Sequence, residues 1–364
     1  MEKTLKITPL DPLFFRSPLP FTAGEQDWAP SSPLPLPGTL YGAIRSLILT
    51  KREFSQFLHG KGYQDIGTPT KKGTLAIKTY MLLRDAKDGS FDYLVPAPSN
   101  IAALNKEAEK ASVKTLEPFL LPGVVFEPPK PQSINAFFYI KEDAEAIPKR
   151  WISLTGLKKY LNQESISSKD LTKPLQLYEP EPKSGIARNR KTKTSEIGKL
   201  YRVDHYRYRD GVSIITIISG TAENLNGIFT LGGERRTAIV REIETDPLEN
   251  FALPQVNNRF LVYLMTPAIF RNGWYPERII SLLEKEGINL QLISAYIPNY
   301  IVISGWDIQK RAPKTLYRAV PEGSIYVFEV KKGNAQDAVK NFHGKNISDV
   351  NPEEGYGFAL VGKI

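Results

Sequence analysis

The sequence predicts an α+β protein built from antiparallel sheets with helices packed on them. Three observations predict this class: alternating apolar residues near the N-terminus, an apolar stripe at helical spacing soon after them, and a strand-helix-strand-strand-helix-strand order towards the C-terminus. At 364 residues, of which 41% are hydrophobic, the chain is too long for one minimal core, which suggests two domains or one domain with large insertions.

The first elements are a strand, a loop and a helix. Leu5 and Ile7 alternate with polar neighbours from Thr4 to Thr8, which is typical of a half-buried strand. A loop rich in proline follows. Thr39 is then placed to cap the N-terminus of a helix. The apolar residues of this helix recur at helical spacing and are Leu40, Ile44, Leu47 and Ile48.

The middle of the chain is less regular. Three prolines and many polar residues predict a long loop from Pro174 to Ser195. From Leu200 the residues become strand-like and continue beyond Val212, so a β-hairpin is expected there. Shorter elements are expected before the loop: a strand over 74–84 and helices over 102–111 and 151–161.

The pattern is clearest from residue 260 onward, where apolar runs predict strands and apolar residues at helical spacing predict helices. With one extra strand, the order is the split-βαβ or ferredoxin-like pattern, which many RNA-recognition sheets share although the fold alone does not establish function. The N-terminal strand and helix can belong to a second, diverged copy. In chain order the C-terminal elements are strand 260–266, helix 276–286, strands 290–295, 300–304 and 324–330, helix 335–342 and strand 358–364.

The most informative local feature is a basic segment between Arg188 and Arg209. Eight of its residues are Arg or Lys, against two acids, and Tyr201, Tyr206 and Tyr208 lie among them. Cations that alternate with aromatic rings suit single-stranded nucleic acid, because the cations bind phosphates and the rings stack on unpaired bases. A solvated, mobile basic loop is the competing interpretation, since most runs of charge are of that kind.

Composition limits the classes of function. The net charge is +9, and the basic segment supplies six of these charges, which indicates a patch rather than a generally basic protein. The absence of cysteine excludes disulfides, zinc ribbons and thiolate catalysis, and His59, His205 and His343 spell out no metal site. No run approaches the ~20 apolar residues of a membrane span. We therefore expect a cytoplasmic protein with no membrane contact, no metal and no cofactor.

Two further places suit phosphate. The N-terminal helix begins beside the loop, and free amides at a helix N-terminus can receive phosphate. Arg16 and Arg45 can supply counter-charge there, unless Arg45 covers the outside of the helix and Arg16 is solvated. The run Gly232-Gly-Glu-Arg-Arg236 combines glycines that permit close approach with arginines that can clamp phosphate. It matches neither a P-loop nor a dinucleotide fingerprint.

A nuclease is the most specific enzymatic hypothesis. Metal-independent RNA cleavage needs a base near the 2′-hydroxyl and a cation for the phosphorane, and His205, Tyr208 and Lys199 can fill these roles. One histidine beside Lys and Tyr also occurs often by chance. Two-metal cleavage needs clustered carboxylates on a rigid frame, which Glu179 and Glu181 in a proline-spaced loop do not provide.

Short blocks in a fixed order give the chain a family resemblance. It resembles the Cmr-type (type III-B) CRISPR RAMP subunit three, over almost the whole chain except the middle, about residues 99–174. The blocks are Thr8-Pro-Leu-Asp-Pro-Leu-Phe-Phe-Arg16, Pro20-Phe-Thr-Ala-Gly24, Thr39-Leu-Tyr-Gly-Ala-Ile-Arg45, Gly185-Ile-Ala-Arg-Asn-Arg190, Leu200-Tyr201, Leu231-Gly-Gly-Glu-Arg235, Ser304-Gly-Trp-Asp307, Pro321-Glu-Gly-Ser-Ile-Tyr326 and Gly355-Tyr-Gly-Phe-Ala-Leu-Val-Gly362.

The resemblance implies two ferredoxin-like (RRM-like, βαββαβ) domains with insertions, which we place at residues 1–219 and 220–364, and a basic β-hairpin. It implies a non-catalytic subunit at the foot of an RNA-guided complex, which holds the repeat-derived 5′ tag of the guide RNA. The expected protein partners are the large polymerase-like subunit and the first backbone subunit, with target RNA nearby.

Transferred to this sequence, the resemblance makes Arg16, Gly24 and Arg45 a cradle for the tag. The family often carries an acid near residue 188, where this chain has Arg188 and Asn189, so a contact made by that acid is not carried over. The other candidate RNA-binding residues are Arg188, Arg190, Lys191, Lys193, Lys199, Tyr201, Arg202, Tyr206, Arg207, Gly232, Gly233, Arg235 and Arg236.

Two alternatives remain open at the level of sequence. A RAMP endoribonuclease that processes precursor guide RNA would use His205 and would lose cleavage when it is replaced by alanine. In the other alternative, the basic segment binds an acidic protein surface and contacts no RNA. High salt weakens both kinds of contact, so crosslinking distinguishes them better than salt dependence.

Overall fold

The computed structural model describes residues 2–18, 28–29, 31–85, 89–104, 112–120, 136–139, 144–147, 149–189, 191–307 and 312–364. The chain forms two compact units, each assembled from three separated segments. Unit 1 comprises Met1–Ile77, Leu175–Glu244 and Val302–Tyr317, and unit 2 comprises Lys78–Pro174, Thr245–Ile301 and Arg318–Ile364. The domain boundary expected between residues 219 and 220 stays a prediction.

Unit 1 contains an antiparallel sheet centred on the N-terminal strand. Strand β1 (Glu2–Pro9) lies between β16 (Val212–Ser219) and β18 (Thr237–Ile243), and β17 (Gly227–Thr230) pairs with the outer side of β18. Leu5 and Ile7 have no exposed surface, as their alternation with polar residues predicts.

Helix α1 (Pro37–Leu49) packs five apolar side chains and Pro37 into the core of unit 1. The expected cap at Thr39 is wrong: Leu36 occupies the N-cap position and offers no side-chain cap. The helix begins earlier because Pro37 has a backbone angle suited to the first turn and has no N–H group to satisfy. A short helix, α2 (Phe54–Leu58), follows.

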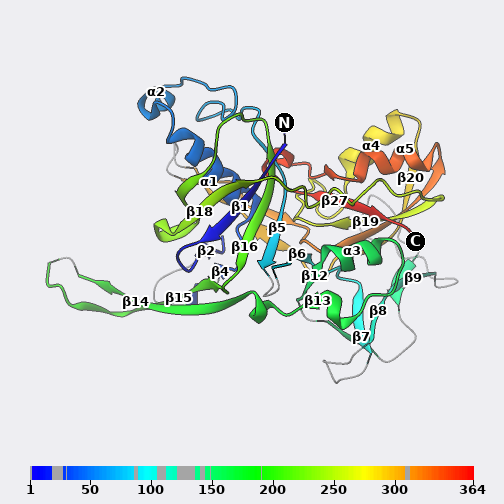
Figure 1. The fold of residues 1–364 in the computed structure, drawn as a ribbon, viewed down its shortest axis with the longest axis horizontal. Helices are drawn as coiled ribbons and strands as arrows, with labels where there is room; N and C mark the ends of the chain where they lie inside the picture. The colour runs from blue at the N-terminus through cyan, green and yellow to red at the C-terminus, as the bar shows by residue number, and fades with distance from the viewer. Residues whose placement is uncertain are drawn as a thin grey trace. The chain divides into compact units, whose positions relative to one another are not determined.

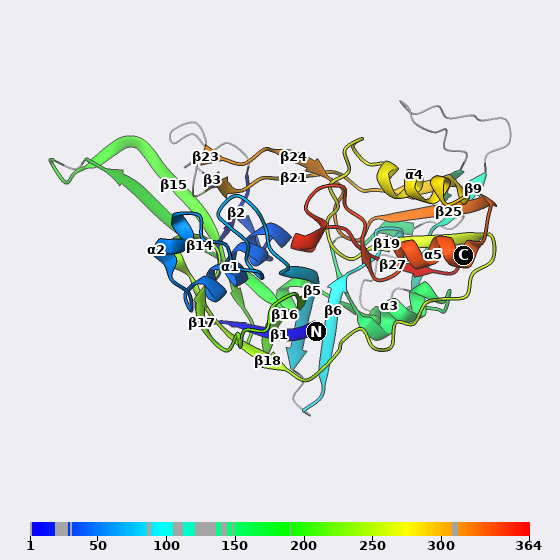
Figure 2. The same ribbon diagram turned by 90° about the horizontal axis from the view of Figure 1, so that it is seen from above.

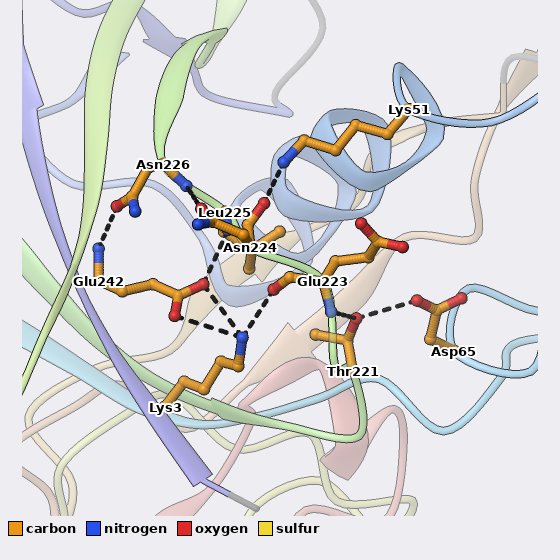
Figure 3. Close-up of polar contacts among 9 residues, drawn as sticks. All are labelled: Lys3, Lys51, Asp65, Thr221, Glu223, Asn224, Leu225, Asn226 and Glu242. Atoms are coloured by element: carbon orange, nitrogen blue, oxygen red, sulfur yellow. Dashed lines mark hydrogen bonds and ion pairs between the residues drawn. The ribbon is translucent and has the colours of Figure 1, made fainter.

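A polar network holds the segment between β16 and β17 against β1 and β18 (Figure 3). Lys3 Nζ donates to the carbonyl of Glu223 at 2.7 Å and to the carboxylate of Glu242 at 3.1 Å. Glu242 Oε1 also accepts a hydrogen bond from the backbone N–H of Leu225 at 2.8 Å. Thr221 Oγ1 donates to Asp65 at 2.9 Å, which connects the same segment to the loop after α2.

Glu242→Ala should lower the free energy of unfolding by about 1–2 kcal/mol, because the Leu225 N–H and the Lys3 ammonium each lose an acceptor. Urea denaturation monitored by fluorescence measures this loss. Glu244→Ala is the matched control, since Glu244 is exposed on the same stretch of chain and a surface substitution there should change stability by less than about 0.5 kcal/mol. Equal effects of both variants would contradict the structural role of Glu242.

A long antiparallel hairpin extends beyond the other elements of unit 1 (Figures 1 and 2). It consists of β14 (Tyr178–Arg188) and β15 (Ser195–Tyr208), paired from Tyr178 opposite Tyr208 to Arg188 opposite Ser195. The loop expected at Pro174–Ser195 is therefore wrong for residues 178–188. Its prolines fit because β14 is an edge strand, and edge strands tolerate residues that have no N–H. The hairpin expected from Leu200 beyond Val212 is also wrong in its pairing, because β15 pairs with β14 whereas β16 pairs with β1.

Unit 2 contains a second antiparallel sheet in the order β20-β25-β19-β27-β26. Helices α4 (Glu277–Lys285) and α5 (Ala335–Phe342) pack on one face of it (Figure 1), where Phe260 and Phe328 lie at the centre of the core. The strands are β19 (Arg259–Leu264), β20 (Asn289–Tyr296), β25 (Ile325–Lys332), β26 (Lys345–Asn346) and β27 (Phe358–Gly362). They confirm the strand and helix order predicted for the C-terminal part.

The other face of this sheet is covered by the segment that matches the family blocks poorly. Val327 and Ile293 pack against Ala136 and the partly buried Phe138 of β10 (Ala136–Tyr139), and Ser294 Oγ donates to the Ala136 carbonyl at 2.8 Å. At these strands the sheet contacts protein, so this part of it is not an open platform for bases.

The helix expected over residues 102–111 is wrong for residues 102–104, which belong to strand β7. Residues 105–111 lie outside the described parts of the chain. The helix expected over 151–161 is confirmed from residue 154. The elements of this region are β5 (Ala76–Asp85), β6 (Phe91–Pro96), β7 (Ile101–Leu104), β8 (Ser112–Thr115), β9 (Glu117–Leu120), β11 (Ala144–Ala146), β12 (Trp151–Ser153), α3 (Leu154–Leu161) and β13 (Leu171–Thr172).

Short strand pairs complete the described structure. They are β2 (Phe15–Arg16) with β4 (Ser31–Ser32), β3 (Trp28–Ala29) alongside β15, β21 (Ile301–Ile303) with β24 (Tyr317–Ala319), and β22 (Trp306–Asp307) with β23 (Ala312–Pro313). Among the residues described, no helix is long and apolar enough to span a membrane, and no cluster of three metal-ligating side chains occurs.

Candidate nucleic-acid interface

Three segments that are far apart in sequence meet in unit 1: residues 11–16, the end of β15 that contains His205 and Tyr206, and the glycine-rich loop 231–237. Leu13 and Tyr206 exchange two backbone hydrogen bonds, each 2.8 Å long. The N–H of Gly233 donates to the carbonyl of Phe14 at 2.8 Å. Two of the places that the sequence marks for phosphate binding, the N-terminal loop and the glycine-rich loop, are thus brought against the basic hairpin.

The glycine-rich loop is tightly placed and strained. Gly232 has a φ of 89°, and a Cβ atom at this position would lie 2.6 Å from the carbonyl oxygen of Phe14. Glu234 and Arg235 both have a φ of 54°, in the left-handed region that residues with side chains seldom occupy. Such strain persists only where the surrounding contacts determine the conformation.

The contact that fixes this loop is a network around His205, whose side chain has no exposed surface. Its Nε2 atom lies 2.9 Å from Glu234 Oε2, and the guanidinium of Arg236 lies 2.7 Å from the same oxygen. The His205 ring stacks on Phe14, with ring centroids 5.0 Å apart. Side chains from all three segments therefore meet at one histidine.

The partners determine how the histidine is protonated. Arg236 also lies 3.2 Å from Nε2, yet this nitrogen can donate to the carboxylate or accept from the guanidinium, not both. We assign the proton to Nε2, because a carboxylate is the stronger acceptor. Burial alone would raise the pKa of Glu234, but the hydrogen bonds from Arg236 and His205 outweigh burial and hold the pKa below its usual value.

Asp11 closes the other end of the loop. Its Oδ2 accepts hydrogen bonds from Thr237 Oγ1 at 2.6 Å and from the Thr237 N–H at 3.0 Å. The side-chain hydrogen bond from Thr237 is the main reason why the pKa of Asp11 is lowered, and the backbone hydrogen bond adds to it.

The Asp11 contact should make stability depend on pH. A carboxyl whose pKa is lower in the folded state stabilises the fold above its unfolded pKa of about 4, and this contribution is lost as pH falls through the folded value. Asp11→Asn should therefore lower the melting temperature at pH 7, and the difference from the wild type should shrink towards pH 3. A difference that is constant over this range would show that the ionised carboxylate is not the stabilising group.

This geometry does not support His205 as the general base of a nuclease. The ring has no solvent-exposed surface, and its Nε2 is occupied by Glu234. Tyr208, the second candidate, donates its hydroxyl to the carbonyl of Pro33 at 2.7 Å, and burial raises its pKa well above the usual value. Both side chains are used to assemble the site.

The arginines at the base of the hairpin are paired with carboxylates. Arg207 contacts Glu181 at 2.6 Å, and Arg209 contacts Glu179 at 2.8 Å across the two strands. Arg202 lies 3.4 Å from Asp204 on its own strand. The prediction that Glu179 and Glu181 lie in a loop without a rigid frame is therefore wrong: both lie on β14, where they neutralise arginines.

The charge of the outer hairpin is less balanced. Residues 188–199 include five basic residues and one acid, Glu196. Arg188 and Lys199 lie on β14 and β15, and Lys191 and Lys193 lie in the connecting turn, which Asn189 Oδ1 closes by accepting from the N–H of Lys191 at 2.9 Å. Arg190 and Gly24 lie outside the described residues.

The hairpin tyrosines pack on protein. Tyr201 lies over Gly185, where a Cβ would come within 2.3 Å of its ring, and it also packs against Phe14 and Val203. Tyr206 forms an edge-to-face contact with Tyr178, with centroids 5.7 Å apart. As candidates for base stacking, Tyr201 and Tyr206 stay predictions.

The two N-terminal arginines differ in their surroundings. Arg16 is exposed on β2, which pairs with β4. Arg45 is half-buried, and its Nε donates to the carbonyl of Ile66 at 2.8 Å while its guanidinium lies 5.4 Å from the centre of the Phe57 ring. Arg45 therefore holds the loop after α2, and a role in RNA binding stays a prediction for both.

Sequence reasoning missed the residues that assemble the site: Asp11, Phe14, Gly185 and Glu234. Glu234 is an acid inside a run selected for its arginines, and its side chain could not be placed without the fold. A signal was present for Gly185 in the motif that contains it, because a glycine within a strand often marks a close approach.

Residues 5–364 match the family model described as CRISPR-associated protein (Cas_Cmr3). The chain belongs to the CRISPR-associated Cmr3 family. This confirms the resemblance drawn from the short blocks, and it makes the chain a subunit of a type III CRISPR effector complex of the Cmr, or type III-B, group.

Solved structures similar to this Cmr3-family chain have low sequence identity. A chain of the type III-B Cmr-beta complex bound to cognate target RNA and AMPPnP is 16% identical, with a TM-score of 0.49 over 89% of this chain and 86% of that chain. A chain of the Csm3–Csm4 subcomplex of the type III-A interference complex is 13% identical, with a TM-score of 0.40 over 91% of this chain and 94% of that chain. No curated protein matches.

Proposed function

We propose that this Cmr3-family protein is a non-catalytic subunit that binds the 5′ tag of the guide RNA. The observation that carries the proposal is the hairpin β14–β15, a pair of strands whose outer part has an excess of basic residues, while glutamates neutralise the arginines at its base. Single-stranded RNA should bind more tightly to this arrangement, because the backbone that carries the cations is already ordered and less entropy is lost on binding.

We also propose that the chain contains two ferredoxin-like domains. The order β20-β25-β19-β27 with α4 and α5 on one face supports a ferredoxin-like domain in unit 2. In unit 1, the order β16-β1-β18 with α1 after β1 supports a second, diverged domain of this kind. The long hairpin and the segment that packs on the unit 2 sheet are then insertions.

Ultraviolet crosslinking of the complex reconstituted from its operon subunits and labelled guide RNA, with peptide mapping, tests tag binding. Crosslinks from the 5′ tag to Tyr201–Arg209, the turn at 189–194 or Arg16 are expected. Absence of crosslinks from this subunit in a fully assembled complex would overturn the proposal and leave the basic segment as a surface for protein docking.

We also propose that the chain docks the large polymerase-like subunit onto the first backbone subunit. A positively charged surface that meets RNA at a junction of subunits is suited to this position. Co-purification tests it: the large subunit should be retained on the tagged first backbone subunit when this chain is present and lost when it is omitted. Retention in its absence would refute the bridging role.

A further inference from the structure

Hydrogen bonds anchor the glycine-rich loop at several residues. Gly233 donates to Phe14, the Leu231 N–H donates to the Arg236 carbonyl at 2.7 Å, and Asp11 binds Thr237. Arg235 is different: within the parts of the chain that the structure describes, its exposed guanidinium has no hydrogen-bond or ion-pair partner.

Glu234 is the residue on which the loop conformation depends. Its carboxylate is the common acceptor of His205 and Arg236, one fully buried and the other mostly buried, although Glu234 itself is 45% exposed. Without it, only the Arg236 guanidinium, 3.2 Å away, would remain beside the His205 Nε2, and Arg236 would lose its carboxylate acceptor. Within the described residues, the buried Nδ1 of His205 and Nε of Arg236 already have no hydrogen-bond partner. The two consecutive residues with positive φ are held in place against their intrinsic preference by this contact.

We propose that Glu234 is a positioning residue that holds the loop in its strained form so that Arg235 binds a phosphodiester of single-stranded RNA. The inference rests on the proposed function and deepens it. Neighbouring residues of the loop then have opposite roles: Glu234 and Arg236 face inward and neutralise each other, while Arg235 keeps an unneutralised charge at the surface.

The partner chemistry follows from the guanidinium. An exposed Arg on a fixed backbone presents a planar set of donors that matches phosphate, and prior immobilisation reduces the entropy lost when the contact forms. The adjoining hairpin also carries an excess of positive charge, and the Leu13–Tyr206 and Gly233–Phe14 hydrogen bonds connect it with the loop. A strand of RNA lying along the hairpin would extend to this loop.

The test uses the full chain and a fluorescent single-stranded RNA that carries the tag, with anisotropy measured at several salt concentrations. Arg235→Ala should weaken binding about 3- to 10-fold and reduce the slope of log affinity against log salt by about 0.7, the value for one lost phosphate contact. Glu234→Ala should give the same two changes. The double variant should bind no more weakly than Arg235→Ala, because Glu234 acts through Arg235.

Glu234→Gln is the conservative variant, and it should restore part of the affinity because its amide oxygen can still accept from Arg236 and His205. This isosteric change also keeps the test valid if Glu234→Ala unfolds the loop. Additive losses in the double variant would overturn the positioning role, as would an unchanged salt slope in Glu234→Ala or an affinity of Glu234→Gln no higher than that of Glu234→Ala.

A hairpin variant, Lys191→Gln with Lys193→Gln, separates failure of the inference from failure of the proposed function. If the hairpin variant weakens RNA binding and the two loop variants bind like the wild type, the inference on Glu234 is wrong while tag binding stands. If neither hairpin nor loop variants change the affinity, the RNA-binding function itself is wrong.

Discussion

Replacing Arg188, Lys191 and Lys193 together by glutamine should weaken binding of single-stranded RNA about 30-fold at 100 mM salt, an estimate for three lost phosphate contacts. The three positions lie on the outer hairpin, where charge is least balanced by acids. The slope of log affinity against log salt should fall by about 2, since each phosphate contact with a single strand contributes about 0.7. Fluorescence anisotropy over a salt series measures both quantities.

The matched control lies on the same hairpin. Arg207→Gln with Arg209→Gln also removes positive charge, but these arginines are bound to Glu181 and Glu179 and are not available to phosphate without breaking ion pairs. We expect a loss below about 3-fold for the control, because Glu181 and Glu179 already neutralise the charges that it removes. Equal losses in both variants would show that RNA responds to total charge, and the distinction between tip and base would be wrong.

Gly232→Ala should lower the free energy of unfolding by about 3 kcal/mol. About 1–2 kcal/mol comes from placing a residue with a Cβ at positive φ, and the rest from overpacking against a backbone atom that cannot move aside. The added methyl would lie 2.6 Å from the Phe14 carbonyl and would push apart the loop and the N-terminal segment. Chemical denaturation measures the change, and RNA binding should fall with it.

Gly60→Ala measures the cost of a Cβ atom at positive φ without the overpacking. Gly60 has a φ of 95°, close to that of Gly232, but a Cβ there would meet nothing within 4 Å. We expect a loss of about 1 kcal/mol for Gly60→Ala. If both substitutions cost the same, close approach to Phe14 is not what requires glycine at position 232.

Elements with a strong period were predictable from sequence. Leu5 and Ile7 alternate because one face of β1 is buried, and Ala338, Val339 and Phe342 follow helical spacing because one face of α5 is buried. The hairpin strand β14 was missed because Pro180 and Pro182 indicate a loop in isolation, and only its edge position makes them acceptable.

The candidate site was partly predictable for a different reason. Charged residues can be counted in the sequence, and their distribution identified the basic segment and the glycine-rich run. The sequence cannot show which charges are already paired, so it treated Arg207, Arg236 and Lys191 alike. The pairing depends on Glu181 and Glu234, which lie 26 and 2 residues from their arginines, and only the fold brings each of these acids to its partner.

The central position of β1 has a consequence for the order of folding. Its two neighbours, β16 and β18, are made more than 200 residues later, and the Asp11–Thr237 contact spans 226 residues. At ~5–20 residues per second of synthesis, the first strand waits on the order of tens of seconds for its partners. Unit 1 therefore closes late, by contacts of high sequence separation, which is a slow kind of folding. The polar alternation of Thr4, Lys6 and Thr8 keeps the waiting strand from presenting a fully apolar surface.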